Sequence, residues 1–246
     1  MIKFVMFCVK AFVATLVGLL VTSCNGKIDL GNSITGSGKV VKEVRNLDSF
    51  DKVTVCCGLE CEIIQAPNFK VTVEADDNLI KDIKTSVING TLKISTDYGN
   101  YVNVTSKKII VEMPNVKSLE TTSGSSLKTI KTIRENSLSL KTSSGSEMNV
   151  ETESDTIRLE STSGSEQKIK GKALVLFTSS SSGSSIEAEG LLANEISSQS
   201  TSGSSTEVNP IVSLKAKASS GSSIDYKNKP KSISKEESSG GSVSRN

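Results

Sequence analysis

The stretch that decides the fold runs from Ser161 to Gly190 and reads STSGSEQKIKGKALVLFTSSSSGSSIEAEG. It contains two Ser-Gly-Ser cores, centred on Gly164 and Gly183, and further copies lie on both sides of it. Serine and glycine at this density are typical of flexible linkers. The spacing of the glycines and the residues between them therefore decide between a linker and a folded repeat.

The glycines of the Ser-Gly cores recur at a nearly constant interval. They are separated by 21, 19, 19, 20, 18 and 19 residues and lie at Gly124, Gly145, Gly164, Gly183, Gly203, Gly221 and Gly240. Seven residues before the glycine, six of the seven copies have a large aliphatic residue, namely Leu138, Ile157, Leu176, Ile196, Leu214 and Ile233. Apolar residues also alternate with polar ones after the glycine, which is typical of strands with one buried face.

This pattern predicts an all-β fold: a single-stranded parallel β-helix, or solenoid, with about 19 residues per coil and an N-terminal β-rich section. Equivalent residues of successive coils would stack about 4.8 Å apart and form internal aliphatic ladders. Glycine suits the bend because it adopts positive φ without a steric penalty. The serines beside it point inward if the alternation continues through the bend, and otherwise they form a surface stripe.

The first residues are typical of a bacterial lipoprotein signal. Lys3 and Lys10 precede an apolar run from Ala11 to Val21, which is too short for a comfortable transmembrane helix. The run ends in Val21-Thr22-Ser23-Cys24, which resembles a lipobox and implies cleavage before Cys24 and lipidation of that residue. An ordinary secretory signal with a chance cysteine is the alternative. We expect an outer-membrane lipoprotein held by acyl chains at Cys24, on the cell surface or facing the periplasm.

Four segments follow from these patterns. They are a lipoprotein signal peptide (1–23), a polar and glycine-rich tether (24–39), an N-terminal β section (40–115) and the Ser-Gly-Ser repeat (116–246). In the third segment, Asn89-Gly90 separates two alternating runs and predicts a hairpin turn.

The segment FDKVTVCCGLECEIIQAPNFKVTVEADDNLIKDIKTSVINGTLKIS, from Phe50 to Ser95, is followed by the repeated Ser-Gly-Ser turns. This combination resembles the auto-transporter adhesin "head GIN" domain family, whose members occur in Bacteroidetes as lipoproteins or secreted proteins. The resemblance covers the chain from about Val40 to its end. It implies an adhesin-like protein of the cell envelope, and it assigns no chemistry.

Three cysteines cluster in the N-terminal section. Cys56, Cys57 and Cys61 lie in VTVCCGLECEII, which reads as a hairpin with Gly58 near the turn. Because a disulfide is the natural expectation outside the cytoplasm, the sequence predicts a bond between Cys56 and Cys61. Cys57 would then be a free thiol or an intermolecular link. Three thiols without a histidine make an incomplete metal site.

The sequence predicts no catalytic, cofactor-binding or metal-binding residue. The chain has no histidine, which excludes a Ser-His-Asp triad. Ser-x-x-Lys spacing occurs at Ser125/Lys128, Ser165/Lys168 and Ser232/Lys235, as often as chance gives in so serine-rich a chain. Glu187, Glu207 and Asp225 should stack on one outward face, where a solvated surface with nearby lysines is favoured over a calcium site.

Charge and architecture limit the function. Without residues 1–23 the chain has 27 basic and 27 acidic residues, and this balance argues against nucleic-acid binding. We expect a non-enzymatic, lipid-anchored envelope protein, an adhesin-like binding or structural module. Its partners would be the membrane, through the anchor, and a glycan or extracellular protein. The alternatives are a carbohydrate-active β-helix enzyme and a periplasmic scaffold lipoprotein.

Overall fold

The computed structural model describes residues 33–246, which form an all-β solenoid without any helix. No helix in this range could therefore cross a membrane. The predicted signal peptide and Cys24 lie outside the described residues. Within the range predicted as a tether, β1 (Ser33–Thr35) pairs with β8 (Asn100–Val102), so this part of that range belongs to the folded β structure.

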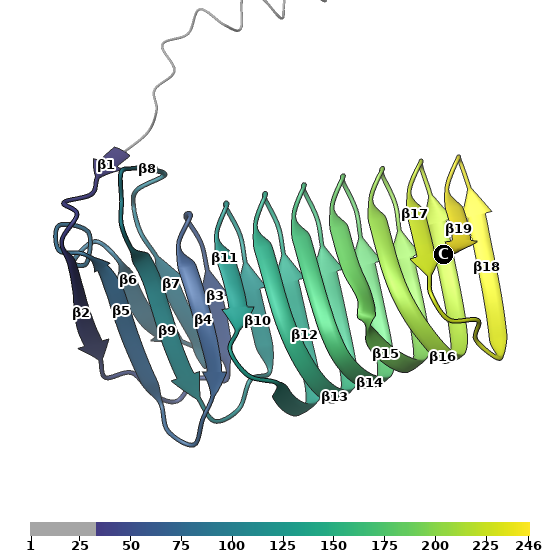
Figure 1. Cartoon of the computed structure of the whole chain (residues 1–246), viewed down its shortest axis with the longest axis horizontal. Helices are drawn as coiled ribbons and strands as arrows, with labels where there is room; N and C mark the ends of the chain where they lie inside the picture. Colours follow the sequence, from purple (N-terminus) through teal and green to yellow (C-terminus); the bar gives the residue numbers. More distant parts are fainter. Residues whose placement is uncertain (1–32) are drawn as a thin grey trace, which may run out of the picture. The chain divides into compact units, whose positions relative to one another are not determined.

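The repeat forms about seven turns of roughly 19 residues each, as the glycine spacing predicts. Strands of successive coils pair in parallel, and the Ser-Gly turns stack along one edge while the long strands bend around the other (Figure 1). The strands are β10 (Ser118–Thr121), β11 (Ser126–Thr129), β12 (Ile133–Thr142), β13 (Glu147–Ser161), β14 (Glu166–Ser180), β15 (Ser185–Ser200), β16 (Ser205–Ser219), β17 (Ser223–Tyr226), β18 (Ser232–Ser238) and β19 (Ser242–Arg245).

Each turn contains two successive residues in the left-handed region. At the turn between β13 and β14, φ is 56° at Ser163 and 68° at Gly164. Two such residues are the signature of a type I′ turn, and glycine takes this conformation without strain. The amide of Gly164 donates to the carbonyl of Ser182 in the next turn, at 3.1 Å, and the turns are thereby linked along the solenoid.

The two serines beside each glycine have different surroundings. The sequence left open whether both point inward or both form a surface stripe, and the structure shows one of each. Ser163, before the glycine, is exposed. Ser165, after it, is 2% exposed, and its Oγ donates to the carbonyl of Thr162 at 2.8 Å. The alternation of inward and outward side chains therefore breaks at the residue before the glycine and resumes at the residue after it.

The interior combines aliphatic ladders with buried hydroxyl groups. The predicted column Leu138, Ile157, Leu176, Ile196 and Leu214 is buried, and only its last member, Ile233, is exposed, at 41%. Near the turns the interior is polar. Ser180 Oγ lies 2.8 Å from Ser200 Oγ and 2.8 Å from Thr206 Oγ1. These bonds satisfy hydroxyls that would be costly to bury alone, which explains how a serine-rich chain fills its core.

The solenoid extends into the N-terminal section. Strands β3 (Lys52–Val55) and β4 (Glu60–Gln65) pair in parallel with β10 and β11. They are joined by Cys57-Gly58, where φ is 66° and 69°. On the other side of these two strands, β7 (Thr91–Ser95) pairs in parallel with β3, and β9 (Lys107–Met113) pairs in parallel with β4.

Antiparallel strands cover the N-terminal end. Strands β2 (Val40–Arg45) and β5 (Lys70–Asp76) continue the sheet from β9, and β6 (Lys84–Ile88) forms a hairpin with β7. The predicted Asn89-Gly90 turn is confirmed, with φ of 51° and 72°. The buried carboxylate of Asp76 accepts backbone hydrogen bonds from Gly38 at 2.9 Å, Ser106 at 2.9 Å and Thr105 at 3.1 Å.

Within residues 33–246 no antiparallel strand covers the C-terminal end of the solenoid. In β18, Lys235 and Glu237 occupy positions that Ala216 and Ala218 fill with buried methyl groups one coil earlier. Lys235 Nζ donates to the carbonyl of Val243 at 2.7 Å, and Glu237 accepts from the amide of Val243 at 2.6 Å. Charges at inward positions of an edge strand oppose the addition of another strand.

Candidate functional site

The cysteine cluster forms a turn and part of the core. The structure pairs Cys56 with Cys57, and not with Cys61 as predicted. The reason is the turn: Cys57 is its first left-handed residue, while Cys61 lies at an inward position of β4 and is buried. Burial raises the pKa of the Cys61 thiol, and the Glu62 carboxylate raises it further. The sulfur atoms of Cys56 and Cys57 therefore belong to the turn, and that of Cys61 belongs to the core.

The acidic residues after the turns stack as predicted. Glu187 pairs with Glu207, and Glu207 with Asp225, in the parallel ladder. Lys168 lies at the head of this column, 3.7 Å from the Glu187 carboxylate. Desolvation raises the pKa of Glu187, and the Glu166 and Glu207 carboxylates raise it further, although Lys168 opposes the shift. Within residues 33–246 no three acidic or thiol groups are arranged to hold a metal ion.

The alternation of inward and outward side chains separates serine from lysine in the Ser125/Lys128 and Ser165/Lys168 pairs. The hydroxyls of Ser125 and Ser165 are buried in the turns. Lys128, in contrast, extends outward to Glu62 at 3.2 Å, and Lys168 bonds Glu166. In these two pairs the serine thus faces inward and the lysine outward, whereas in the third pair Ser232 is exposed and Lys235 occupies an inward position.

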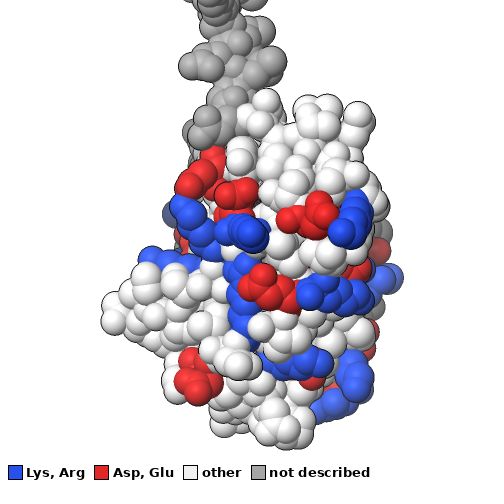
Figure 2. Space-filling view, turned by 90° about the vertical axis from the view of Figure 1, so that its left-hand side faces the viewer, with Lys and Arg blue, Asp and Glu red and all other residues white. Residues whose placement is uncertain are grey.

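Charged side chains of both signs are interleaved on the N-terminal end of the solenoid (Figure 2). Lys42 binds Glu74 at 2.8 Å, and Lys70 lies 3.8 Å from Glu112. This end therefore carries no extended field of one sign.

A groove of about 740 Å³ lies on the edge opposite the Ser-Gly turns, where the long strands bend. We call it the corner groove. Its floor is made by Ser154 and Ala173, which pair with each other in adjacent coils. It has a polar end formed by Arg134, Glu135, Asn136, Glu153 and Asp155. At the other end, which we call the apolar end, Leu174, Leu192 and Ile211 lie beside Lys172 and Asn194.

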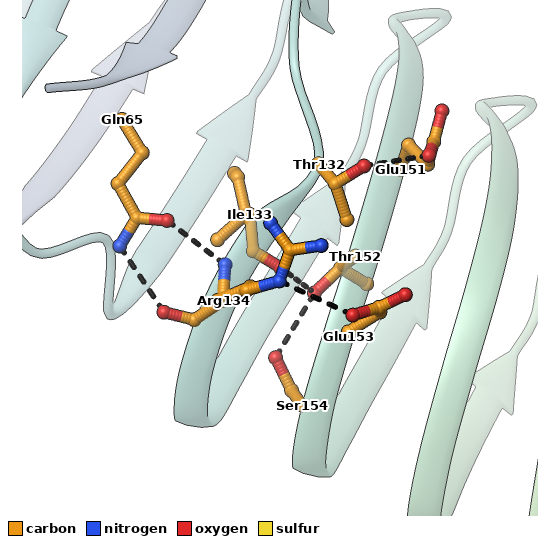
Figure 3. Close-up of polar contacts among 8 residues, drawn as sticks. All are labelled: Gln65, Thr132, Ile133, Arg134, Glu151, Thr152, Glu153 and Ser154. Atoms are coloured by element: carbon orange, nitrogen blue, oxygen red, sulfur yellow. Dashed lines mark hydrogen bonds and ion pairs between the residues drawn. The ribbon is translucent and has the colours of Figure 1, made fainter.

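The polar end of the corner groove is held by a hydrogen-bond network (Figure 3). Arg134 Nε lies 3.2 Å from the Glu153 carboxylate, and the backbone amide of Arg134 donates to Gln65 Oε1 at 2.8 Å. Gln65 Nε2 in turn donates to the carbonyl of Arg134 at 3.1 Å. Ser154, on the floor, lies 2.9 Å from the hydroxyl of Thr152. These contacts fix the polar groups before any ligand arrives, which lowers the entropy lost on binding.

The apolar end exposes three neighbouring aliphatic side chains. Leu174 is 52% exposed, Leu192 38% and Ile211 42%. Single exposed aliphatic residues are ordinary, and three that line one groove are a candidate interaction surface. Bulges near this corner, where the pairing of β15 with β16 shifts between Ala188 and Leu192, alter which residues face outward.

The corner also contains a glycine that the packing requires. Gly171 has φ of 123°, and a Cβ at this position would lie 1.9 Å from the carbonyl oxygen of Thr152 in the preceding coil. Only glycine allows the two coils to approach here. The corner groove was not predicted from the sequence, where its one visible signal is the interruption of the alternation by Gly171, Gly190 and Pro210.

Solved structures share this architecture at low sequence identity. A "putative adhesin" from Bacteroides fragilis NCTC 9343 aligns with a TM-score of 0.79 and 19% identity, over 87% of this chain and 100% of that chain. A "putative lipid binding protein" from Parabacteroides distasonis ATCC 8503 aligns with a TM-score of 0.73, 19% identity and the same coverage. A "putative adhesin" from Parabacteroides merdae ATCC 43184 gives 0.70 and 15%, over 87% of this chain and 99% of that chain.

At these identities the likeness establishes the fold alone. Among proteins with curated descriptions, none matches this sequence. The family model described as "Putative auto-transporter adhesin, head GIN domain" matches residues 49–230, which include most of the solenoid. The chain therefore belongs to the head GIN domain family.

Proposed function

We propose that this protein is a lipid-anchored binding protein of the cell envelope, of the adhesin type, and that it acts without catalysis. The corner groove carries this proposal, because it joins a pre-arranged polar end to an apolar end on one rigid scaffold. A few placed polar groups beside apolar surface are typical of binding sites. The adhesin description of the family supports the same reading.

The shape of the groove suits an extended partner. It crosses successive coils, and each coil adds about 4.8 Å along the solenoid axis. An extended segment of an extracellular protein could place a charged side chain against Arg134 or Glu153 and an apolar one against Leu174 and Leu192. The acyl chains expected at Cys24 would keep this surface at the membrane.

Lipid binding is a second candidate function, and the layout of the groove favours it. A lipid also combines a charged head group with an apolar chain, and a structure of similar fold bears the name "putative lipid binding protein". The two candidates differ in the occupant of one groove, and a single set of variants tests both.

The test uses the chain without residues 1–24, on panels of extracellular matrix proteins, glycans and lipid vesicles. We expect one partner class to bind, and the double variant Leu174→Asp, Leu192→Asp to weaken binding at least tenfold. Ile130→Asp is the matched control, because Ile130 is 47% exposed and lies outside the groove. Equal loss in the control, or no loss in the double variant, contradicts the proposed site. Vesicle binding alone would select the lipid candidate.

The anchor is tested separately in cells. Cys24→Ala should move the protein from the membrane fraction to the soluble fraction. Protease treatment of intact cells should degrade a surface-exposed protein and spare a periplasmic one. Protection from protease contradicts the adhesin reading and supports a periplasmic scaffold.

A further inference from the structure

A second surface feature lies on the face formed by the strand halves that precede the turns. Within β10 to β19 the aromatic residues are Phe177 and Tyr226, and Tyr226 is buried. Phe177 is only half-buried and occupies an outward column between Arg158 and Ser197. The core does not require an aromatic residue at this position, because Ser139 occupies it two coils earlier and Ser197 one coil later.

The two faces of the Phe177 ring have different surroundings. The Arg158 guanidinium carbon lies 4.2 Å from the ring centroid and covers one face. Arg158 lies in the coil before Phe177, and on the side of the next coil the column continues with Ser197 and then Lys215. The side chain of Ser197 is too short to cover an aromatic ring. Two hollows, of about 490 and 280 Å³, are both lined by Phe177 and Ser197 and therefore lie on the two sides of this pair of side chains.

The space over Ser197 has the dimensions of a slot. Phe177 and Lys215 are two coils apart, which corresponds to roughly 9.6 Å at the usual strand spacing. A ring that lies flat between two walls needs about 7–8 Å, which is twice the contact distance between carbon atoms. Hydrogen-bonding groups surround the slot, among them Gln199 on one side and Glu195 and Ser213 on the other.

The charges beside the slot are incompletely paired. Within residues 33–246 neither Arg158 nor Lys215 takes part in an ion pair. In the neighbouring outward column, Lys141 binds Glu160 at 2.8 Å and Lys217 binds Glu236 at 2.7 Å. Two unpaired cations and one carboxylate, Glu195, leave the slot with a positive balance.

We propose that this slot binds one pyranose ring of an acidic oligosaccharide. The face of an aromatic ring is electronegative and attracts the C–H bonds on the apolar face of a sugar. The serine, glutamine and glutamate side chains meet the sugar hydroxyls, and Lys215 meets a carboxylate or sulfate group. The site is separate from the corner groove and does not depend on that groove's function.

The test measures binding of the chain without residues 1–24 to an array of neutral, uronic-acid and sulfated oligosaccharides. We expect acidic oligosaccharides to bind best. Phe177→Ala should remove the stacking surface and Ser197→Trp should fill the slot, each weakening binding at least tenfold. Lys215→Ala should abolish the preference for acidic over neutral sugars.

Ser118→Trp is the matched control, because Ser118 lies in the same outward column three coils before Phe177. It should bind like the wild type. An array without any bound oligosaccharide, full binding by Phe177→Ala or Ser197→Trp, or equal binding of neutral sugars by the wild type would overturn the proposal. The corner-groove variant Leu174→Asp, Leu192→Asp should retain oligosaccharide binding, which distinguishes failure of this site from failure of the proposed function.

Discussion

Replacing Ser165 by alanine should destabilise the solenoid, whereas the same change at Ser163 should have almost no effect. Both serines flank Gly164 and look equivalent in the sequence. In the structure Ser165 is buried and Ser163 is exposed. This pair therefore tests the turn geometry with one chemical change at two adjacent positions.

The magnitude follows from the contacts of each hydroxyl. Ser165 Oγ accepts from the amide of Thr162 at 3.2 Å, donates to its carbonyl at 2.8 Å, and lies 2.9 Å from Ser161 Oγ. Alanine would leave buried polar groups without this partner, at a cost of about 1–3 kcal/mol in free energy of unfolding. The Ser163 hydroxyl has one contact, 3.4 Å from Thr162 Oγ1, so its loss should change stability by less than about 0.5 kcal/mol.

Urea denaturation of both variants measures the difference, with an unchanged m value showing that the same surface is exposed on unfolding. The equivalent pair one turn earlier, Ser146→Ala and Ser144→Ala, repeats the test. Equal effects at the two positions, or a larger effect at Ser163, would refute the assignment of inward and outward serines.

Four further predictions follow from other parts of the molecule. Leu159→Ala should cost about 2–5 kcal/mol in urea denaturation, because Leu159 is buried in an internal ladder. Hydrogen bonds from three backbone amides outweigh the burial of Asp76 and hold its pKa below the ordinary value. The stability from this carboxylate is complete above about pH 4 and is lost as the pH falls through its lowered pKa, so Asp76→Asn should flatten that acid dependence. Burial raises the pKa of the Cys61 thiol, so Cys61 should react with a thiol reagent at pH 8 only after unfolding. Lys235→Leu with Glu237→Val should cause concentration-dependent association in analytical ultracentrifugation, because the C-terminal edge would lose its inward charges.

For each of these four predictions, one experimental result would contradict the structural explanation. A cost below about 1 kcal/mol at Leu159 would mean that the ladder is loosely packed. An unchanged acid transition in Asp76→Asn would mean that this carboxylate does not bind the loop as described. Rapid labelling of native Cys61 would contradict its burial, and a monomeric Lys235→Leu, Glu237→Val variant would show that another feature protects the edge.

The repeat could be predicted because its glycines and inner columns are set by stacking. A residue in an inner column contacts its equivalents in the coils before and after it, so the constraint recurs every coil and is visible as a period. Gln167 and Thr206 lie three residues after the glycine, at an inward position, and both are buried in spite of their polarity. Gln167 Nε2 donates to the carbonyl of Glu160 at 2.7 Å, which explains how the column accepts it.

The coil before Gly124 was not recognised in the sequence. Its turn is Cys57-Gly58-Leu59, in which a cysteine and a buried leucine replace the two serines of the later turns. The same substitution misled the disulfide prediction, since the hairpin reading placed Cys56 opposite Cys61. The backbone conformation is conserved along the solenoid, but its serine signature is not.

The corner groove could not be predicted, because bulges change the register locally. In a regular strand, the side-chain alternation tells which residues face outward. A bulge adds an unpaired residue and reverses the alternation beyond it, at a position that composition does not fix. Leu192 and Ile211 lie at such a corner and are exposed, at 38% and 42%.

The exposed apolar residues are informative because the solenoid does not need them. Stability comes from the inner columns and the turns, which repeat in every coil, so outward positions can be filled by serine, lysine or glutamate without loss. Phe177 and Leu174 interrupt columns that neighbouring coils fill with polar residues. Neither side chain adds to the internal ladders, and each exposes apolar surface that favours association. Residues that depart from the repeat on its outer side, without a role in packing, are therefore the positions where a binding function is best sought.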